Sequence, residues 1–139
     1  MTNDVQVEPV LYILMRTDMD SMNPGKAMAQ ASHASNAFVH RHSKNLMTKQ
    51  WQEQTPDGFG TVIVLGVGGE MELTYCLGQA DDLASLGVDI VSGEVVDPTY
   101  PVGDGLVTHL VEMVTCGYIF MDRNDTLVRR VVQDLKLHE

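Results

Sequence analysis

Residues 9–34 read PVLYILMR-TDMDSMN-PGKAMAQASHA, and this stretch decides the fold. Residues 9–15 form an apolar run without alternation, which is typical of a central strand covered on both faces. Asn23 can cap a helix, and Pro24 stands at the first helical position, where proline is tolerated. The stretch therefore predicts a buried strand, a polar loop over residues 16–23, and a helix over residues 24–46.

The first turn of this helix carries a lysine, although helix N-termini favour negative charge. Lys26 and the free backbone N–H groups together could bind an anion. At about 100° per residue, Lys26, Gln30 and His33 share one stripe of the helix, beside an apolar stripe of Ala27, Ala31, Ala34 and Phe38. The polar stripe is either a chemical site or a set of ordinary surface side chains with one satisfied histidine.

The same stretch contains a motif in four short pieces: Arg16-Thr17-Asp18, Gly25-Lys26, Ala29-Gln30 and Ser32-His33-Ala34. Over residues 10–38 the chain resembles the type II peptidyl-tRNA hydrolase family. That family shows an Arg-Thr/Asn-Asp turn and then Gly-Lys-x-Ala-Ala-Gln-x-Ser-His-Ala, in which Met28 here replaces one alanine. The resemblance implies a compact α/β domain that hydrolyses the ester between a peptide and the 3′ ribose of tRNA, and it suggests a homodimer.

The resemblance also implies the residues of the site. Its candidate catalytic residues are Lys26, Asp97, His33 and Thr115, and its candidate substrate-binding residues are Arg16, Asp18, Gln30 and Thr99. Asp97 would orient or deprotonate a water, and Lys26 would stabilise the oxyanion or hold a 3′-terminal phosphate. A threonine, Thr99 or Thr115, would hydrogen-bond the water. His33 is either a base or a structural partner of Asp18.

No cofactor or metal is expected. The sequence has no Gly-x-Ser-x-Gly, no cysteine-histidine nucleophile and no metal-ligand cluster, so direct attack by water fits better than a covalent intermediate.

The chain departs from the family after Asp97. The family continues Asp-Ala-Gly-Arg-Thr-Gln, whereas this chain continues Asp97-Pro98-Thr99-Tyr100-Pro101-Val102. Two further interpretations therefore stay open. One is a catalytically inactive relative that binds RNA or a basic protein partner, and the other is an enzyme for a different small ester or amide.

Composition indicates one domain in a reducing compartment. The chain has 139 residues with 44% hydrophobic content, enough for a core. We expect a disordered tail over residues 1–8 and a domain over residues 9–139. The tail is polar and acidic rather than a signal peptide, and no apolar run is long enough to cross a membrane. Cys76 and Cys116 are expected to be buried thiols rather than a disulfide, so the predicted location is cytoplasmic.

The formal net charge of −10 is unusual for a protein that acts on a polyanion. No Lys or Arg lies between Gln50 and Asp122, so the basic residues form an early group from Arg16 to Lys49 and a late group from Arg123 to Lys136. These groups would form one basic face if they met in space. Five residues of the early group form a cluster: His40, Arg41, His42, Lys44 and Lys49. This cluster either stabilises the C-terminus of a helix, where positive charge is favourable, or contacts a phosphate backbone.

The remaining pattern predicts an α/β domain in the order β-α-β-α-β-(β)-β-α. We expect strands over 61–67, 88–96 and 115–121, an optional edge strand over 106–113, and helices over 70–86 and 122–135. The sheet is thus mixed, with four strands or five, and helices cover both of its faces. Trp51 and Phe59 either pack in the core or offer a stacking surface for a terminal base.

Overall fold

The structure, a computed structural model, describes residues 6–139 apart from the side chain of residue 104. Along the chain lie β1 (Pro9–Arg16), α1 (Pro24–His42), α2 (Leu46–Gln52), β2 (Val62–Val67), α3 (Glu70–Ser85), β3 (Ile90–Asp104), β4 (Val107–Asp122), α4 (Thr126–Arg129) and β5 (Lys136–Leu137). A tail is expected over residues 1–8, and its first five residues lie outside the described part of the chain.

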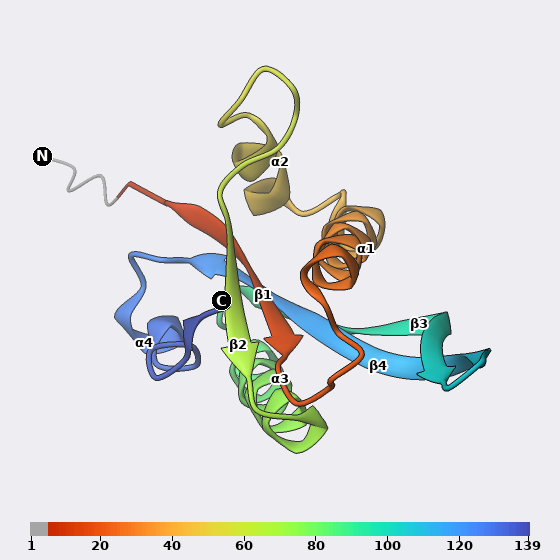
Figure 1. The fold of residues 1–139 in the computed structure, drawn as a ribbon. Coiled ribbons are helices and arrows are strands. Elements are labelled where there is room, and N and C mark those ends of the chain that lie inside the picture. The colour runs from red at the N-terminus through yellow and green to blue at the C-terminus, as the bar shows by residue number, and fades with distance from the viewer. Residues whose placement is uncertain (1–5) are drawn as a thin grey trace, which may run out of the picture.

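The five strands form one mixed sheet in the order β3-β4-β1-β2-β5. β1 occupies the centre, where it runs parallel to β2 and antiparallel to β4. α1 and α2 lie on one side of the sheet and α3 on the other (Figure 1). The predicted α/β class with a mixed sheet and helices on both faces is confirmed.

β1 divides its apolar run between the two halves of the core. Successive side chains of a strand point to opposite faces, so a strand covered on both faces has no polar side. Val10, Tyr12 and Leu14 join the core beneath α3 and α4. The intervening positions join the core beneath α1 and α2, where the large members are Leu11, Ile13, Met15, Phe38, Trp51, Tyr118 and Phe120.

The second half of the sheet differs from the expected pattern. The predicted strands over 106–113 and 115–121 are a single long strand, β4, paired with an equally long β3. β3 does not end at Asp97 but continues to Asp104, with a register shift between Asp97 and Tyr100. Its two prolines are tolerated because β3 is an edge strand. The resulting hairpin extends to the right of the molecule beyond α1 (Figure 1).

The helices also differ in length from those predicted. α1 ends at His42, and Asn45 starts the separate helix α2 by accepting a hydrogen bond from the N–H of Met47 at 2.8 Å. The helix expected over 122–135 is only one turn of α-helix, α4, followed by further turns. The chain then forms β5, which covers the outer edge of β2. The fifth strand of the sheet is therefore this C-terminal segment rather than 106–113.

Two side-chain expectations are settled by burial. Trp51 is 1% exposed, its indole N–H donates to the carbonyl of Thr61 at 2.8 Å, and its ring packs edge-on against Phe38, so it belongs to the core. Phe59, in contrast, is exposed and lies outside the core. Cys76 and Cys116 are buried free thiols in opposite halves of the core.

In the part of the chain that the structure describes, no helix combines the length and apolar character needed to span a bilayer.

Candidate active site

The start of α1 is built as the sequence predicts. The side chain of Asn23 accepts a hydrogen bond from the N–H of Lys26 at 2.9 Å, and Pro24 occupies the first turn. The Lys26 ammonium turns toward the β3–β4 hairpin, where it donates to the carbonyl of Pro101 at 3.0 Å. It also lies 5.3 Å from the centroid of the Tyr100 ring, within cation–π range. The hairpin therefore holds the cation of the helix N-terminus in place.

One turn further along α1, Gln30 connects two strands. Its Nε2 donates to the carboxylate of Asp97 on β3 at 2.7 Å, and its Oε1 accepts from the hydroxyl of Thr115 on β4 at 2.7 Å. Gln30 is 3% exposed and Thr115 is fully buried. Because both polar groups of the amide are satisfied, the contacts define the orientation of the Gln30 side chain.

Asp97 is kept in its ionised form. It lies at the register shift of β3, where the N–H of Thr99 donates to its carboxylate at 2.9 Å. This bond contributes most and the bond from Gln30 comes next, and together with the nearby His33 they hold the pKa of Asp97 below its ordinary value despite the opposing effect of burial. A carboxylate with a lowered pKa is a weak base, so this environment suits orientation of a water better than removal of its proton.

Thr115 and Cys116 lie behind this cluster. Thr115 has no exposed surface, and its hydroxyl donates to the amide oxygen of Gln30, which it thereby helps to position. Burial raises the pKa of the Cys116 thiol to about 11, which leaves it protonated and poorly nucleophilic at neutral pH.

Arg16 and Asp18 bind each other. The guanidinium donates to both carboxylate oxygens of Asp18, at 3.0 and 2.8 Å, and to the carbonyl of Val114 at 2.9 Å. The bond from Arg16 holds the pKa of Asp18 below its usual value. Because Asp18 neutralises the cation, this pair connects the end of β1 to β4 and is a poor phosphate site. Asp18 is thus paired with Arg16 rather than with His33.

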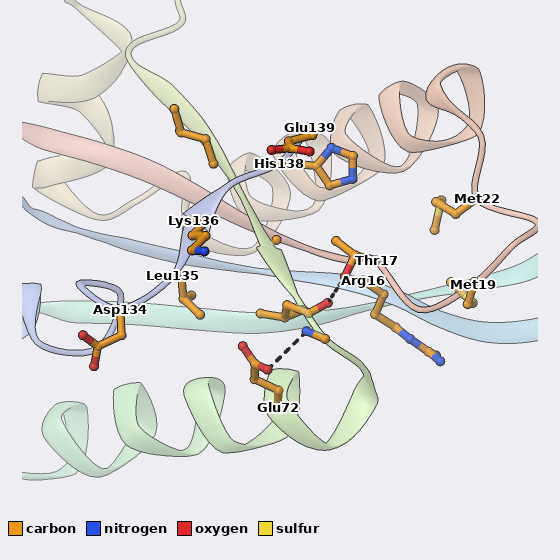
Figure 2. A pocket seen from close by; sticks show the side chains of 14 residues that line it. Arg16, Thr17, Met19, Met22, Glu72, Asp134, Leu135, Lys136, His138 and Glu139 are labelled. Atoms are coloured by element: carbon orange, nitrogen blue, oxygen red, sulfur yellow. Dashed lines mark hydrogen bonds between the residues drawn. The ribbon is translucent and has the colours of Figure 1, made fainter.

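A groove of about 550 Å³ opens beside the Arg16 end of β1, away from the Lys26–Asp97 cluster. Figure 2 shows it between the loop that follows β1, the first turn of α3 and the C-terminal segment. Its lining carries both signs of charge, with Arg16 and Lys136 positive and Glu72, Asp134 and Glu139 negative. The groove is therefore not a purely basic surface of the kind that attracts a phosphate.

The segments that build the site also carry a family signature. The family model described as peptidyl-tRNA hydrolase PTH2 matches residues 9–97, from the start of β1 to the carboxylate that Gln30 holds. The chain belongs to this family. A search of curated proteins finds no match. The resemblance to type II peptidyl-tRNA hydrolases is thus confirmed, and the matched region ends where the sequence departs from the family pattern.

The structure brings most of the predicted site residues together. Lys26, Gln30, Asp97, Thr99 and Thr115 converge where α1 meets the base of the hairpin. His33 is exposed on the next turn of α1 and affects Asp97 by its charge.

Tyr100 is the residue that sequence reasoning misplaces. The strand expected over residues 88–96 would leave it in the loop that follows, but it lies within β3 and is fully buried against Lys26, with its hydroxyl 3.2 Å from that of Ser21. The register shift that turns it inward has no local sequence signal apart from the neighbouring prolines.

The two basic groups meet only in part: Arg16 and Lys136 line the same groove, but the basic residues of α1 and α4 lie apart. α1 packs on the core half that contains Phe38, whereas Val128 of α4 packs on the opposite half, beneath α3. The basic residues of α1 therefore stand apart from Arg129 and Arg130 of the late group.

Proposed function

We propose that this chain hydrolyses the ester bond of peptidyl-tRNA by direct attack of water, with Lys26 and Asp97 at the reaction centre. The observation that carries the proposal is the Gln30 bridge, which holds the Asp97 carboxylate of β3 against α1, one helical turn along α1 from Lys26. Membership of the peptidyl-tRNA hydrolase family supports the substrate class.

The proposed reaction adds the water oxygen to the ester carbonyl carbon, breaks the bond to the 3′ ribose oxygen, and transfers one water proton to that oxygen. The ionised Asp97 accepts a hydrogen bond from the water and aims its lone pair at the carbonyl. The Lys26 ammonium stabilises the oxyanion as charge develops on the carbonyl oxygen. Thr99 and Gln30 hold Asp97, and Thr115 holds Gln30.

A covalent route receives no support from the cysteine beside the cluster. A nucleophilic thiol needs a lowered pKa, and burial acts on Cys116 in the opposite direction. Water is therefore the proposed nucleophile.

The test is release of peptide from peptidyl-tRNA by the purified protein. Loss of one donor to a developing oxyanion typically lowers the rate by about 100-fold or more, so Lys26→Ala should fall at least that far. Asp97→Asn should also lose activity. Lys136→Ala removes the same charge from β5 and should keep the wild-type rate.

The sequence differs from the family pattern after Asp97, and this difference is the reason to consider an alternative in which the protein binds but does not catalyse. If folded wild-type protein released no peptide, the proposal would be wrong, and an inactive binding protein of this family would be favoured. A near-normal rate for Lys26→Ala would instead remove that residue from the mechanism.

A further inference from the structure

Charge is strongly segregated in this acidic protein. Residues 21–52, which include α1 and α2, contain no Asp or Glu, and they contain four of the nine Lys and Arg residues and three of the five histidines. This segment has a formal charge of +4, whereas the rest of the chain has −14. A polyanion is therefore attracted to the α1–α2 layer and repelled by the remaining surface.

Three of the five basic side chains of α1 follow one edge of the helix. Residues seven apart on a helix are offset by only about 20°, so Lys26, His33 and His40 form one row, and Lys44 follows just beyond the last turn. His33, His40 and Lys44 are exposed. At 1.5 Å per residue, the 19 residues of α1 span about 28 Å. We call this row, together with Arg41, the α1 track.

Arg41 anchors the far end of the α1 track. Its guanidinium donates to the carbonyl of Glu94 at 3.2 Å and lies 5.9 Å from the ring centroid of Tyr118. These neighbours leave its charge without a carboxylate partner among the described residues, unlike that of Arg16. An exposed arginine held in this way is pre-organised to bind a phosphate.

We propose that the α1 track binds the sugar-phosphate backbone of the RNA substrate, with the 3′ end at Lys26 and the stem running along α1 toward Lys44. The inference rests on the proposed function for the position of the 3′ end. The polarity follows because the cluster around Asp97 lies in the N-terminal half of α1, and the row of basic side chains runs from there toward Lys44.

The first test measures binding without catalysis. The probe is a hairpin RNA with a duplex stem and a single-stranded 3′ end but no peptide, titrated by fluorescence anisotropy over a range of salt concentrations. The test variant is Arg41→Gln with Lys44→Gln, and the matched control is Arg129→Gln with Arg130→Gln, which removes the same charge from the other face. The single variant Lys44→Gln changes only an exposed side chain, so it still tests the α1 track if replacement of Arg41 disturbs folding.

We expect the test variant to bind at least about 10-fold more weakly, with a salt slope shallower by roughly 0.7–0.9 for each phosphate that is no longer neutralised. The control should bind as wild type does. Equal weakening of both variants would overturn the α1 track, because net charge alone would then explain the binding. Unchanged binding of both would overturn it as well, because Arg41 and Lys44 would then make no contact with the RNA.

The second test separates binding of the stem from chemistry. A peptide esterified to a single ribonucleoside lacks the stem, so the test variant should cleave it at the wild-type kcat/KM while its KM for peptidyl-tRNA rises. Binding of the hairpin RNA without any hydrolysis would retain the α1 track and reject the proposed function. If the test variant hydrolysed peptidyl-tRNA with an unchanged KM, the α1 track would be rejected and the proposed function would be retained.

Discussion

Gln30 joins Asp97 to Thr115, with one 2.7 Å hydrogen bond from each end of its amide. The three residues come from α1, β3 and β4, so a single side chain ties the helix to both strands of the hairpin. Such a buried polar bridge is stabilising only while every member stays satisfied. The bridge therefore couples the geometry of the carboxylate to the packing of α1.

We predict that Gln30→Leu lowers both stability and activity. The buried Thr115 hydroxyl loses its short bond, which should cost about 1–3 kcal/mol in the free energy of unfolding. Asp97 loses one of the bonds that hold it, and misplacement of a reacting group can reduce kcat on the order of 100-fold. Denaturant unfolding and peptide release measure the two effects. Gln133→Leu, the same change at an exposed position, should alter neither.

The pH dependence of stability should report the same carboxylate. Because the folded-state pKa of Asp97 lies below the ordinary value of 3.8, its ionised form stabilises the fold fully above that value. The contribution is lost as the pH falls through the folded-state pKa. Wild type should therefore exceed Asp97→Asn in stability at pH 6, and the difference should shrink as the pH falls below 3.8.

Carboxyl NMR of Asp97 tests the cause directly. In Gln30→Leu the pKa should move up toward 3.8, because one hydrogen bond to the charged form is gone. An unchanged pKa in this variant would show that Thr99 and His33 alone depress it.

Arg16 and Asp18 should behave as a structural pair. Asp18→Asn removes the nearest charged partner of the guanidinium, whose side chain is 11% exposed, and leaves only the Glu70 carboxylate at 3.9 Å. We expect a loss of about 1–3 kcal/mol in stability, typical of a hydrogen bond between charged groups. KM for peptidyl-tRNA should stay near the wild-type value at a temperature where the variant is folded. A large rise in KM with unchanged stability would instead support the substrate-binding role expected from the motif.

The first half of the fold is predictable because its signals are local. The apolar run of β1 requires two covered faces, and Asn23 with Pro24 defines the start of α1. The family pattern points to the carboxylate at Asp97, although the structure alone shows that Gln30 holds it. That contact joins positions 67 residues apart, so no spacing within α1 could have indicated it.

The second half is less predictable because tertiary pairing outweighs local periodicity there. The apolar positions of residues 122–135 have helical spacing, yet the chain leaves the helix after Arg129. Val131 and Val132 still enter the core, and the following residues pair with β2, whose edge would otherwise be exposed. The prolines of β3 predict the end of a strand, but an edge strand needs hydrogen-bond donors on one side only.

Tyr100 supplies the last prediction, because it lies beyond the family match and contacts Lys26. Tyr100→Phe loses the hydroxyl near Ser21 and should cost about 1 kcal/mol in stability, while the ring still faces the ammonium. Tyr100→Leu removes the ring, and cation–π contacts contribute about 0.5–2 kcal/mol, so kcat for peptide release should fall by up to about 30-fold.

Comparison of the two Tyr100 variants separates packing from positioning of Lys26. Both reduce stability, but only Tyr100→Leu should reduce kcat when each is assayed well below its melting temperature. The Lys26→Ala background provides the control, because the leucine substitution should have no further effect on kcat once the ammonium is absent. An equal loss of kcat in both backgrounds would mean that Tyr100 acts on the site through packing of the hairpin, and that Lys26 is held by Pro101 alone.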